Sequence, residues 1–203
     1  MALMTETRPR NRRGQGERLR EEIADAAQRM LDELGDDEAL SLRAVAREVG
    51  IAATSVYLHF ADRDALVLAV LERFQRQTAE AADAAEATAA DPVGKLRARV
   101  RRVAESARTH AGLYKVLHES ALNRRVDMSF KRSIADGTTA AVAACMRAGA
   151  IPHGDAEEIS LDLRAAVHGA VSMRVNQPEA AEGESLDAQI DRFLHKIAGV
   201  PRR

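Results

Sequence analysis

Hydroxyl side chains of Thr54 and Ser55 follow two alanines in a short stretch that reads IAATSVYLHF from position 51. Hydroxyl groups can donate to or accept from base edges, whereas Ala52 and Ala53 can only contact thymine methyl groups or allow close approach. Arg43 lies shortly before this stretch and can bind a phosphate or a base. No Arg, Asn or Gln follows in this stretch. If this stretch binds DNA, phosphate contacts would therefore supply much of the affinity. Arg43, a basic arm formed by residues 1–16, or DNA shape would supply the specificity.

These side chains need two helices to present them, and the segment 41–60 has the pattern of both. Its first half carries apolar residues at the spacing of a helix with one buried face, namely Leu42, Val45, Ala46 and Val49. Gly50 then breaks this helix where a positive φ costs little. Val56 and Phe60 lie one turn apart in a second short helix. Two short helices joined by a tight glycine turn predict a helix-turn-helix.

A supporting helix is predicted before this motif and a long helix after it. The segment 17–35 has an apolar stripe and, on the opposite face, Arg18, Asp25, Arg29 and Asp32. We expect Gly35 to end this helix, Ser41 to cap the next one, and Asp62 to cap the long helix that follows. The second half of that long helix, 78–90, is mostly alanine and acid. We interpret this half as a solvated extension or a frayed end.

Five further helices are predicted beyond Pro92, over 93–110, 112–123, 128–148, 155–175 and 186–198. No alternation typical of β-strands is present, so the sequence predicts an all-α protein of about nine helices. We expect three parts: a disordered basic arm over 1–16, a DNA-binding head over 17–77, and a helical body over 78–203. The arm would contact phosphates or a minor groove, or would simply be a solvated terminus.

The first of the five body helices, over 93–110, is strongly basic and invites a nucleic-acid interpretation. Its apolar stripe divides the basic residues into two flanking groups, so they form no single row that could face DNA. We interpret it as a packed helix with solvated margins, whose cations pair with acids between Glu80 and Asp91.

Composition narrows the class of protein further. The net charge is -1, which argues against nonspecific coating of nucleic acid but allows a specific binder with clustered basic residues. The one cysteine, Cys145, allows no internal disulfide and fits a buried apolar position better than a redox sensor. No apolar run reaches the roughly 18 residues of a membrane span, and the N-terminus has no signal-peptide pattern. The expectation is a soluble cytoplasmic protein with no membrane partner.

The segment from Leu40 to Leu71, with Ile23–Ala27 before it, resembles the TetR family of transcriptional regulators. The most specific part is SVYLHF followed by DRDAL, from Ser55 to Leu66. This resemblance implies an all-α fold that binds double-stranded operator DNA. It places Tyr57 and His59 at DNA-backbone contacts and Arg63 at a phosphate contact. The alternatives are a core aromatic role for Tyr57 and a packing role for His59.

The resemblance also implies a body that holds a small effector and forms a homodimer. Candidate effector-pocket residues are Tyr114, Leu117, His118, Phe130, Met146, His168 and Met173. Each of them could instead be plain core. Small residues and the apolar last helix favour a two-fold four-helix dimer interface at Ala165, Ala166, Gly169, Ala170, Ile190, Phe193 and Leu194. Ordinary packing within one chain is the alternative. A weaker similarity lies at Val167-His168-Gly169, which resembles part of a tryptophan-histidine-glycine signature in one class of TetR C-terminal domains.

The sequence favours a homodimeric repressor that a small-molecule effector releases from its operator. Two other classes stay open. One is a ligand-blind DNA-binding or adaptor protein, and the other is a helical-bundle enzyme with a borrowed head. The enzyme interpretation needs a catalytic constellation, and no nucleophile motif, phosphate loop or metal-ligand spacing among the histidines is present. We therefore expect no enzyme activity, no cofactor and no metal.

Overall fold

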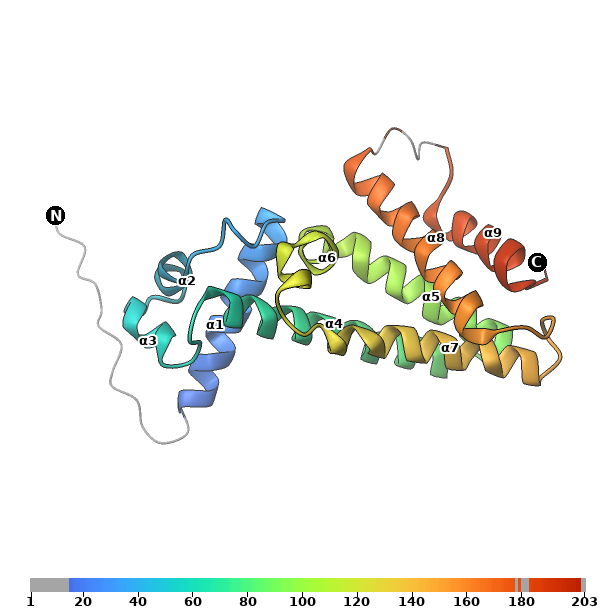
Figure 1. The fold of residues 1–203 in the computed structure, drawn as a ribbon, viewed down its shortest axis with the longest axis horizontal. Helices are drawn as coiled ribbons and strands as arrows, with labels where there is room; N and C mark the ends of the chain where they lie inside the picture. Colours follow the sequence, from blue (N-terminus) through green and yellow to red (C-terminus); the bar gives the residue numbers. More distant parts are fainter. Residues whose placement is uncertain (1–14, 178, 180–182, 202–203) are drawn as a thin grey trace.

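The computed structural model describes residues 15–177, 179 and 183–201, and over these residues every regular element is a helix (Figure 1). The elements are α1 (Gln15–Leu34), α2 (Leu42–Val49), α3 (Ala53–Tyr57), α4 (Arg63–Ala87), α5 (Pro92–Thr109), α6 (Ala111–Glu119), η1 (Ala121–Arg124), η2 (Ser129–Lys131), α7 (Arg132–Arg147), α8 (Ala156–Asn176) and α9 (Leu186–Ala198). The predicted all-α class is confirmed. The basic arm predicted over 1–16 lies outside the described residues, apart from the first two residues of α1.

Local signals set the helix ends of the N-terminal half, as the sequence predicted. The Ser41 hydroxyl accepts from the Ala44 backbone N–H at 3.1 Å and begins α2. Gly50 ends α2 with a φ of 73°, a left-handed value that glycine adopts without a Cβ penalty. The Asp62 carboxylate accepts from the Ala65 N–H at 2.8 Å and begins α4. Because each cap satisfies an otherwise free backbone group, these positions are fixed by local chemistry.

Two predicted body helices are each divided in two. The helix expected over 112–123 stops at Glu119 and continues as η1, because Ser120 leaves helical geometry with a ψ of 143°. The Ser120 hydroxyl then accepts from the Leu122 N–H at 3.0 Å. The helix expected over 128–148 begins as η2, after a turn in which the Asp127 carboxylate accepts from the Ser129 N–H at 2.8 Å. Serine and aspartate side chains compete here with the helical ladder.

The chain folds into an elongated molecule with α1, α2 and α3 at one end and α9 toward the other (Figure 1). α4 runs from the head into the body alongside α7. One apolar core, the head core, joins residues of α1 to α4 with Leu113, Val116, Leu117 and Leu122. The second, the body core, joins α5, α7, α8 and α9. α6 therefore contributes to the head core although it follows the head in sequence; the domain boundary near residue 77 stays a prediction.

The alanine-rich half of α4 is a packed helix, which contradicts its interpretation as a solvated or frayed segment. Thr78 and Ala82 are buried. Arg99 of α5 is 3% exposed and donates to Asp83 at 2.6 Å and to Glu86 at 2.9 Å. The expected pairing of α5 cations with α4 acids is confirmed. The margins of α5 are solvated only in part, because Arg97 and Arg99 are buried whereas Arg108 is exposed. Carboxylates from the neighbouring helices allow the arginines to be buried.

No helix within the described residues combines the length and apolar character that crossing a membrane requires.

Candidate DNA-binding surface and internal cavity

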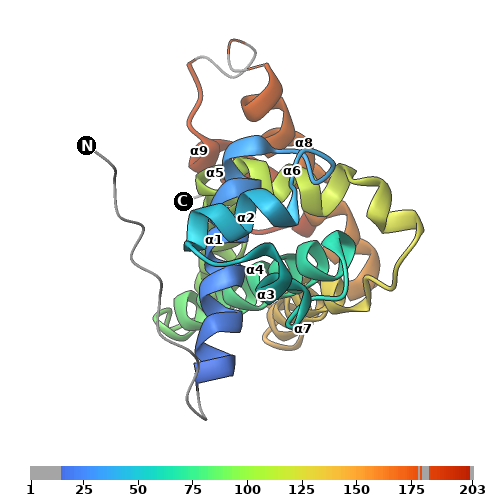
Figure 2. The same ribbon diagram turned by 90° about the vertical axis from the view of Figure 1, so that its left-hand side faces the viewer.

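The helix-turn-helix lies at the end of the molecule, where α2 and α3 face outward (Figure 2). Val56 is fully buried and holds α3 against the head core. Thr54 is exposed, Ser55 is half-buried and Tyr57 is 54% exposed. The exposure of Tyr57 excludes the alternative in which it is a core aromatic residue. α3 therefore turns polar and aromatic side chains away from the core.

Leu58 is an exposed residue that the sequence interpretation did not single out. It is 84% exposed at the end of α3, between Tyr57 and His59. An exposed leucine provides an apolar surface of the kind that contacts thymine methyl groups. The sequence could have indicated this exposure, because Leu58 lies one residue after Tyr57 and two before the buried Phe60. Helical spacing places such a position away from the buried face.

Arg20 of α1 fixes the end of α3 and was also missed. Its guanidinium donates to the His59 backbone carbonyl at 2.6 Å and lies 4.3 Å from the centroid of the Phe60 ring. The first contact satisfies a carbonyl at the end of α3, and the second is a cation–π contact. No sequence pattern indicates this residue, because the pairing joins positions 39 apart. The His59 side chain is half-buried beside it.

The two arginines predicted to bind DNA have different surroundings. Arg43 on α2 is exposed and forms no ion pair or hydrogen bond with any residue that the structure describes. Arg63 is half-buried and donates through Nε and Nη2 to Asp64 at 3.2 Å and 3.0 Å. Asp64 also pairs with Arg125 at 3.5 Å. Arg43 can thus bind a phosphate directly, whereas Arg63 must share its guanidinium with Asp64.

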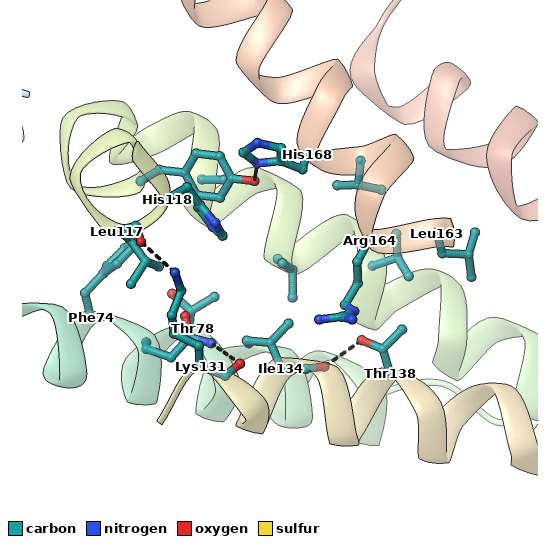
Figure 3. Close-up of a pocket in the computed structure, with 16 residues that line it drawn as sticks. Phe74, Thr78, Leu117, His118, Lys131, Ile134, Thr138, Leu163, Arg164 and His168 are labelled. Atoms are coloured by element: carbon teal, nitrogen blue, oxygen red, sulfur yellow. Dashed lines mark hydrogen bonds between the residues drawn. The ribbon is translucent and has the colours of Figure 1, made fainter. Parts of the chain in front are cut away.

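The body contains a cavity of about 300 Å³ between α4, α5, α6, α7 and α8 (Figure 3). Four of the seven predicted pocket residues line it: Tyr114, Leu117, His118 and His168. The other three do not. Phe130 packs against the head core, Met146 is 6% exposed inside the body core, and Met173 is 48% exposed on α8. Helical spacing alone could not separate cavity wall from core, because both are apolar.

Three rings form a polar cluster on the wall made by α6 and α8. The Tyr114 hydroxyl lies 2.7 Å from His168 Nδ1, and the His118 ring lies 4.4 Å and 4.8 Å from the Tyr114 and His168 rings. Burial raises the pKa of Tyr114, so its hydroxyl stays protonated beside His168. Burial, together with the charges of Lys131 and His168, lowers the pKa of His118 to about 3. His118 lines the cavity and keeps an exposed surface, and its ring is neutral at physiological pH.

Two cations, Lys131 and Arg164, also line the cavity, and no Asp or Glu is among its lining residues. Lys131 Nζ donates to the Leu117 carbonyl at 2.7 Å and to Asn123 Oδ1 at 2.8 Å. Burial lowers its pKa. The Nε atom of Arg164 is buried and has no hydrogen-bond partner. The sequence allowed a mainly apolar cavity to be predicted, but it did not indicate that two cations line the wall.

On the side of α6 that faces away from the cavity, a carboxylate of α1 joins this helix to the head. Asp32 of α1 accepts from the Gly112 and Leu113 N–H groups at 3.1 Å and 3.2 Å, and its second oxygen lies 2.7 Å from His110 Nδ1. The residue before α6 provides no side-chain cap of its own. A Cβ on Gly112 would lie 1.9 Å from the Asp32 carbonyl oxygen. Asp32 was expected on the solvated face of α1; instead it caps a helix of the body.

The seven predicted dimer residues divide according to burial within the single chain. Ala170, Ile190 and Leu194 are 3%, 0% and 0% exposed, and the two residues of α9 belong to the body core, so their side chains have no free surface to offer a partner. Ala165 is exposed, and Ala166, Gly169 and Phe193 are half-buried. α8 also exposes three large apolar side chains, Leu161, Met173 and Val175. The apolar surface of α8 that is left uncovered thus includes residues which the sequence interpretation did not select.

Within the described part of the chain, no three His, Cys, Asp or Glu side chains gather as a metal ion would require.

The fold and these two sites define a helix-turn-helix DNA-binding protein whose body encloses a cavity of ligand size. Residues 23–70 match the model of the bacterial regulatory proteins of the tetR family. Residues 96–197, half of the chain, match the tetracyclin repressor-like C-terminal domain. The chain belongs to the TetR family of transcriptional regulators, which bind operator DNA and form dimers.

Similar proteins agree with this membership. A helix-turn-helix transcriptional regulator of Haemophilus influenzae is 47% identical over 58 residues, which are 29% of this chain and 28% of the relative. The similarity to this curated relative thus spans little more than a quarter of its length. A protein of unknown function from Rhodococcus sp. RHA1 has a TM-score of 0.74 and 26% identity, covering 89% of this chain and 95% of that one. SmeT of Stenotrophomonas maltophilia, described as the repressor of a multidrug efflux pump, has a TM-score of 0.68 and 22% identity, covering 86% and 88%.

Proposed function

We propose that this protein is a dimeric repressor that binds operator DNA through α2 and α3 and is released when a small molecule fills the body cavity. The observation that carries this proposal is the position of α6. This helix is capped by Asp32 of the head on one side and contributes Tyr114, Leu117 and His118 to the cavity wall on the other. A ligand that moves α6 must therefore act on α1.

Contact with DNA is assigned to the outward residues of the helix-turn-helix. Thr54 and Ser55 would reach base edges, Tyr57 and Leu58 would contact the sugar-phosphate backbone or thymine methyl groups, and Arg43 would bind a phosphate. The sequence also suggested backbone contacts by His59 and a phosphate contact by Arg63. Arg63 would exchange part of its pairing with Asp64 for a phosphate oxygen. Since α3 carries few base-reading groups, two heads reading two half-sites would be required for specificity.

Dimerisation is assigned to the surface of α8 that the body core leaves uncovered. Leu161, Ala165, Gly169 and Met173 lie four residues apart along α8 and so share one face. The space beside Gly169 is open, with no atom within 4 Å of a Cβ placed there. A second copy of α8 could approach closely at this point. Phe193 of α9, half-buried in the single chain, would add an apolar contact.

Release by an effector follows from differential binding. A ligand that fits the cavity only when α6 has shifted would favour the head position that does not match the operator half-sites. The strength of release would be set by the ratio of ligand affinities for the two states. Ligand-blind DNA binding is the alternative: in that case no compound that binds the cavity changes the affinity for DNA.

The test begins with selection of operator duplexes from a random pool, using the purified full chain. In gel-shift assays we expect Tyr57→Ala combined with Arg63→Ala to weaken binding by roughly 100-fold or more, because charge-assisted contacts are lost in both heads. Arg102→Ala, on the body helix α5, is the control and should bind as the wild type does. Retention of full affinity by a folded double variant would overturn the assignment of the DNA-binding surface.

A further inference from the structure

Arg164 of α8 is half-buried, and its surroundings differ from those of the two buried arginines of the body. Arg97 pairs with Asp191 at 3.0 Å, and Arg99 pairs with Asp83 and Glu86. Arg164 has no carboxylate partner among the described residues. Its buried Nε has no hydrogen-bond partner; the Nε of Arg99 has none either, but the Nη1 of Arg99 is paired with two carboxylates. A cation that is partly withdrawn from water and has no partner loses some of its hydration without compensation. The cost would be offset if an anion bound beside it.

The orientation of Arg164 gives such an anion a place to bind. Its side chain extends from α8 into the cavity, and the guanidinium ends near Ile134 of α7 (Figure 3). A guanidinium presents a planar fork of N–H groups that matches the two oxygens of a carboxylate. Lys131 borders the same cavity and is bound only to uncharged oxygens. Its charge is therefore not neutralised locally and adds to the positive potential.

The remaining wall suits an apolar group. Carbon-rich side chains of three helices, α4, α5 and α8, line it, namely Phe74, Val100, Val103, Leu163 and Val167. His118 adds no charge, because burial lowers its pKa to about 3. A volume of about 300 Å³ lies at the small end of ligand pockets. The site thus combines one anion-binding group with space for a compact apolar body.

We propose that the cavity binds an amphipathic organic carboxylate, with the carboxylate on Arg164 and the apolar part among the side chains of α4, α5 and α8. This inference rests on the proposed function, because it names the chemical class of the effector. A doubly charged phosphate monoester would lose more hydration energy in a wall this apolar than a carboxylate does. An alkylammonium ion would be repelled by Lys131 and Arg164.

The experiment measures binding by isothermal titration to the DNA-free protein, with probes matched in shape. One set is octanoate, octanol and octylammonium; the other is cyclohexylacetate, cyclohexylethanol and cyclohexylethylammonium; octyl phosphate is added to the first. In at least one set we expect the carboxylate to bind roughly tenfold or more tightly than its alcohol, the usual gain from a charge-assisted hydrogen bond. The ammonium ion should bind more weakly than either.

Two arginine variants test whether Arg164 causes the tighter binding of the carboxylate. Arg164→Gln should reduce the affinity for the carboxylate to that for the alcohol, whereas Arg102→Gln, on a half-buried arginine that pairs with Glu105 instead, should leave it unchanged. Melting temperatures without ligand show whether each variant is folded. The proposal is overturned if the carboxylate has no advantage in either set, if a folded Arg164→Gln keeps that advantage, or if octyl phosphate binds more tightly than octanoate.

The same probes separate this inference from the proposed function. A carboxylate that binds through Arg164 but leaves the operator complex intact would support the ligand class and contradict release. Release by the alcohols as well as by the carboxylates, unaffected by Arg164→Gln, would support release and contradict the ligand class.

Discussion

The two sides of α6 have opposite packing. Toward α1 there is no free space: Gly112 lies so close to the Asp32 backbone that a single added carbon would overlap it. Toward the body, Tyr114, Leu117 and His118 border an empty volume of about 300 Å³. A helix held rigidly on one side and loosely on the other can be displaced by a ligand and must carry its partner with it. We therefore propose α6 as the element that couples the cavity to the head.

The largest loss of stability is expected from adding a carbon atom at the tight contact between α6 and α1. Gly112→Ala places a Cβ 1.9 Å from a backbone carbonyl, and backbone cannot move away as a flexible side chain would. We expect a loss of about 3 kcal/mol in the free energy of unfolding, at the upper end for overpacking. Urea unfolding measures it. Gly16→Ala in α1, with no atom within 4 Å of its added Cβ, is the control and should be close to neutral.

A smaller loss of stability is expected when the side chain of α1 that caps α6 is removed. Asp32→Ala deletes the acceptor of the Gly112 and Leu113 N–H groups and should cost about 1–2 kcal/mol, as the loss of other helix caps does. Asp32→Asn keeps one acceptor oxygen and should cost less. Glu33→Ala changes an exposed neighbour and should leave the unfolding midpoint in place. If Asp32→Ala is as stable as Glu33→Ala, the cap does not hold α6 to the head.

The smallest effect on the free energy of unfolding is expected at His118, on the cavity side of α6, and it depends on pH. The pKa of His118 is lowered from 6.5 to about 3 in the folded protein, so below pH 6.5 the unfolded chain binds a proton that the folded chain does not. His118 therefore destabilises the fold progressively as the pH falls from 6.5 toward 3. Because part of its surface is accessible, the loss between pH 7 and pH 5 should be less than about 1 kcal/mol.

Urea unfolding at the two pH values should show less acid destabilisation in His118→Gln than in the wild type. His153→Gln, at an exposed position, should behave as the wild type does. Equal acid destabilisation of all three proteins would mean that the His118 ring is as accessible to protons in the folded state as in the unfolded one.

The head could be predicted from sequence because its signals are local. Ser41, Gly50 and Asp62 each act on backbone groups within a few residues, so their roles do not depend on the rest of the fold. The spacing of Val56 and Phe60 likewise decided which face of α3 is buried. The bounds of α9 were predicted from the helical spacing of its apolar residues, and the structure adds local signals at both ends, the cap Ser185 and the final Gly199.

The contacts between head and body could not be predicted, because they join residues far apart in the chain. Asp32 was one charge on an apparently solvated face, and its partners lie about 80 positions later. Arg20 and Arg164 gave no signal for the same reason: a single arginine on a helix is usually a surface residue. Phe130 and Met146 were assigned to a cavity because apolar periodicity describes a buried face without saying whether that face meets another side chain or empty space.

Reciprocal linkage provides the most direct test of the coupling through α6. The affinity of a cavity ligand, first identified by its effect on the melting temperature, is measured by isothermal titration with and without saturating operator duplex. If cavity and head are coupled, the operator should weaken ligand binding by about tenfold, and the ligand should weaken operator binding by the same factor. Equal ligand affinity in the presence and absence of operator would contradict the account.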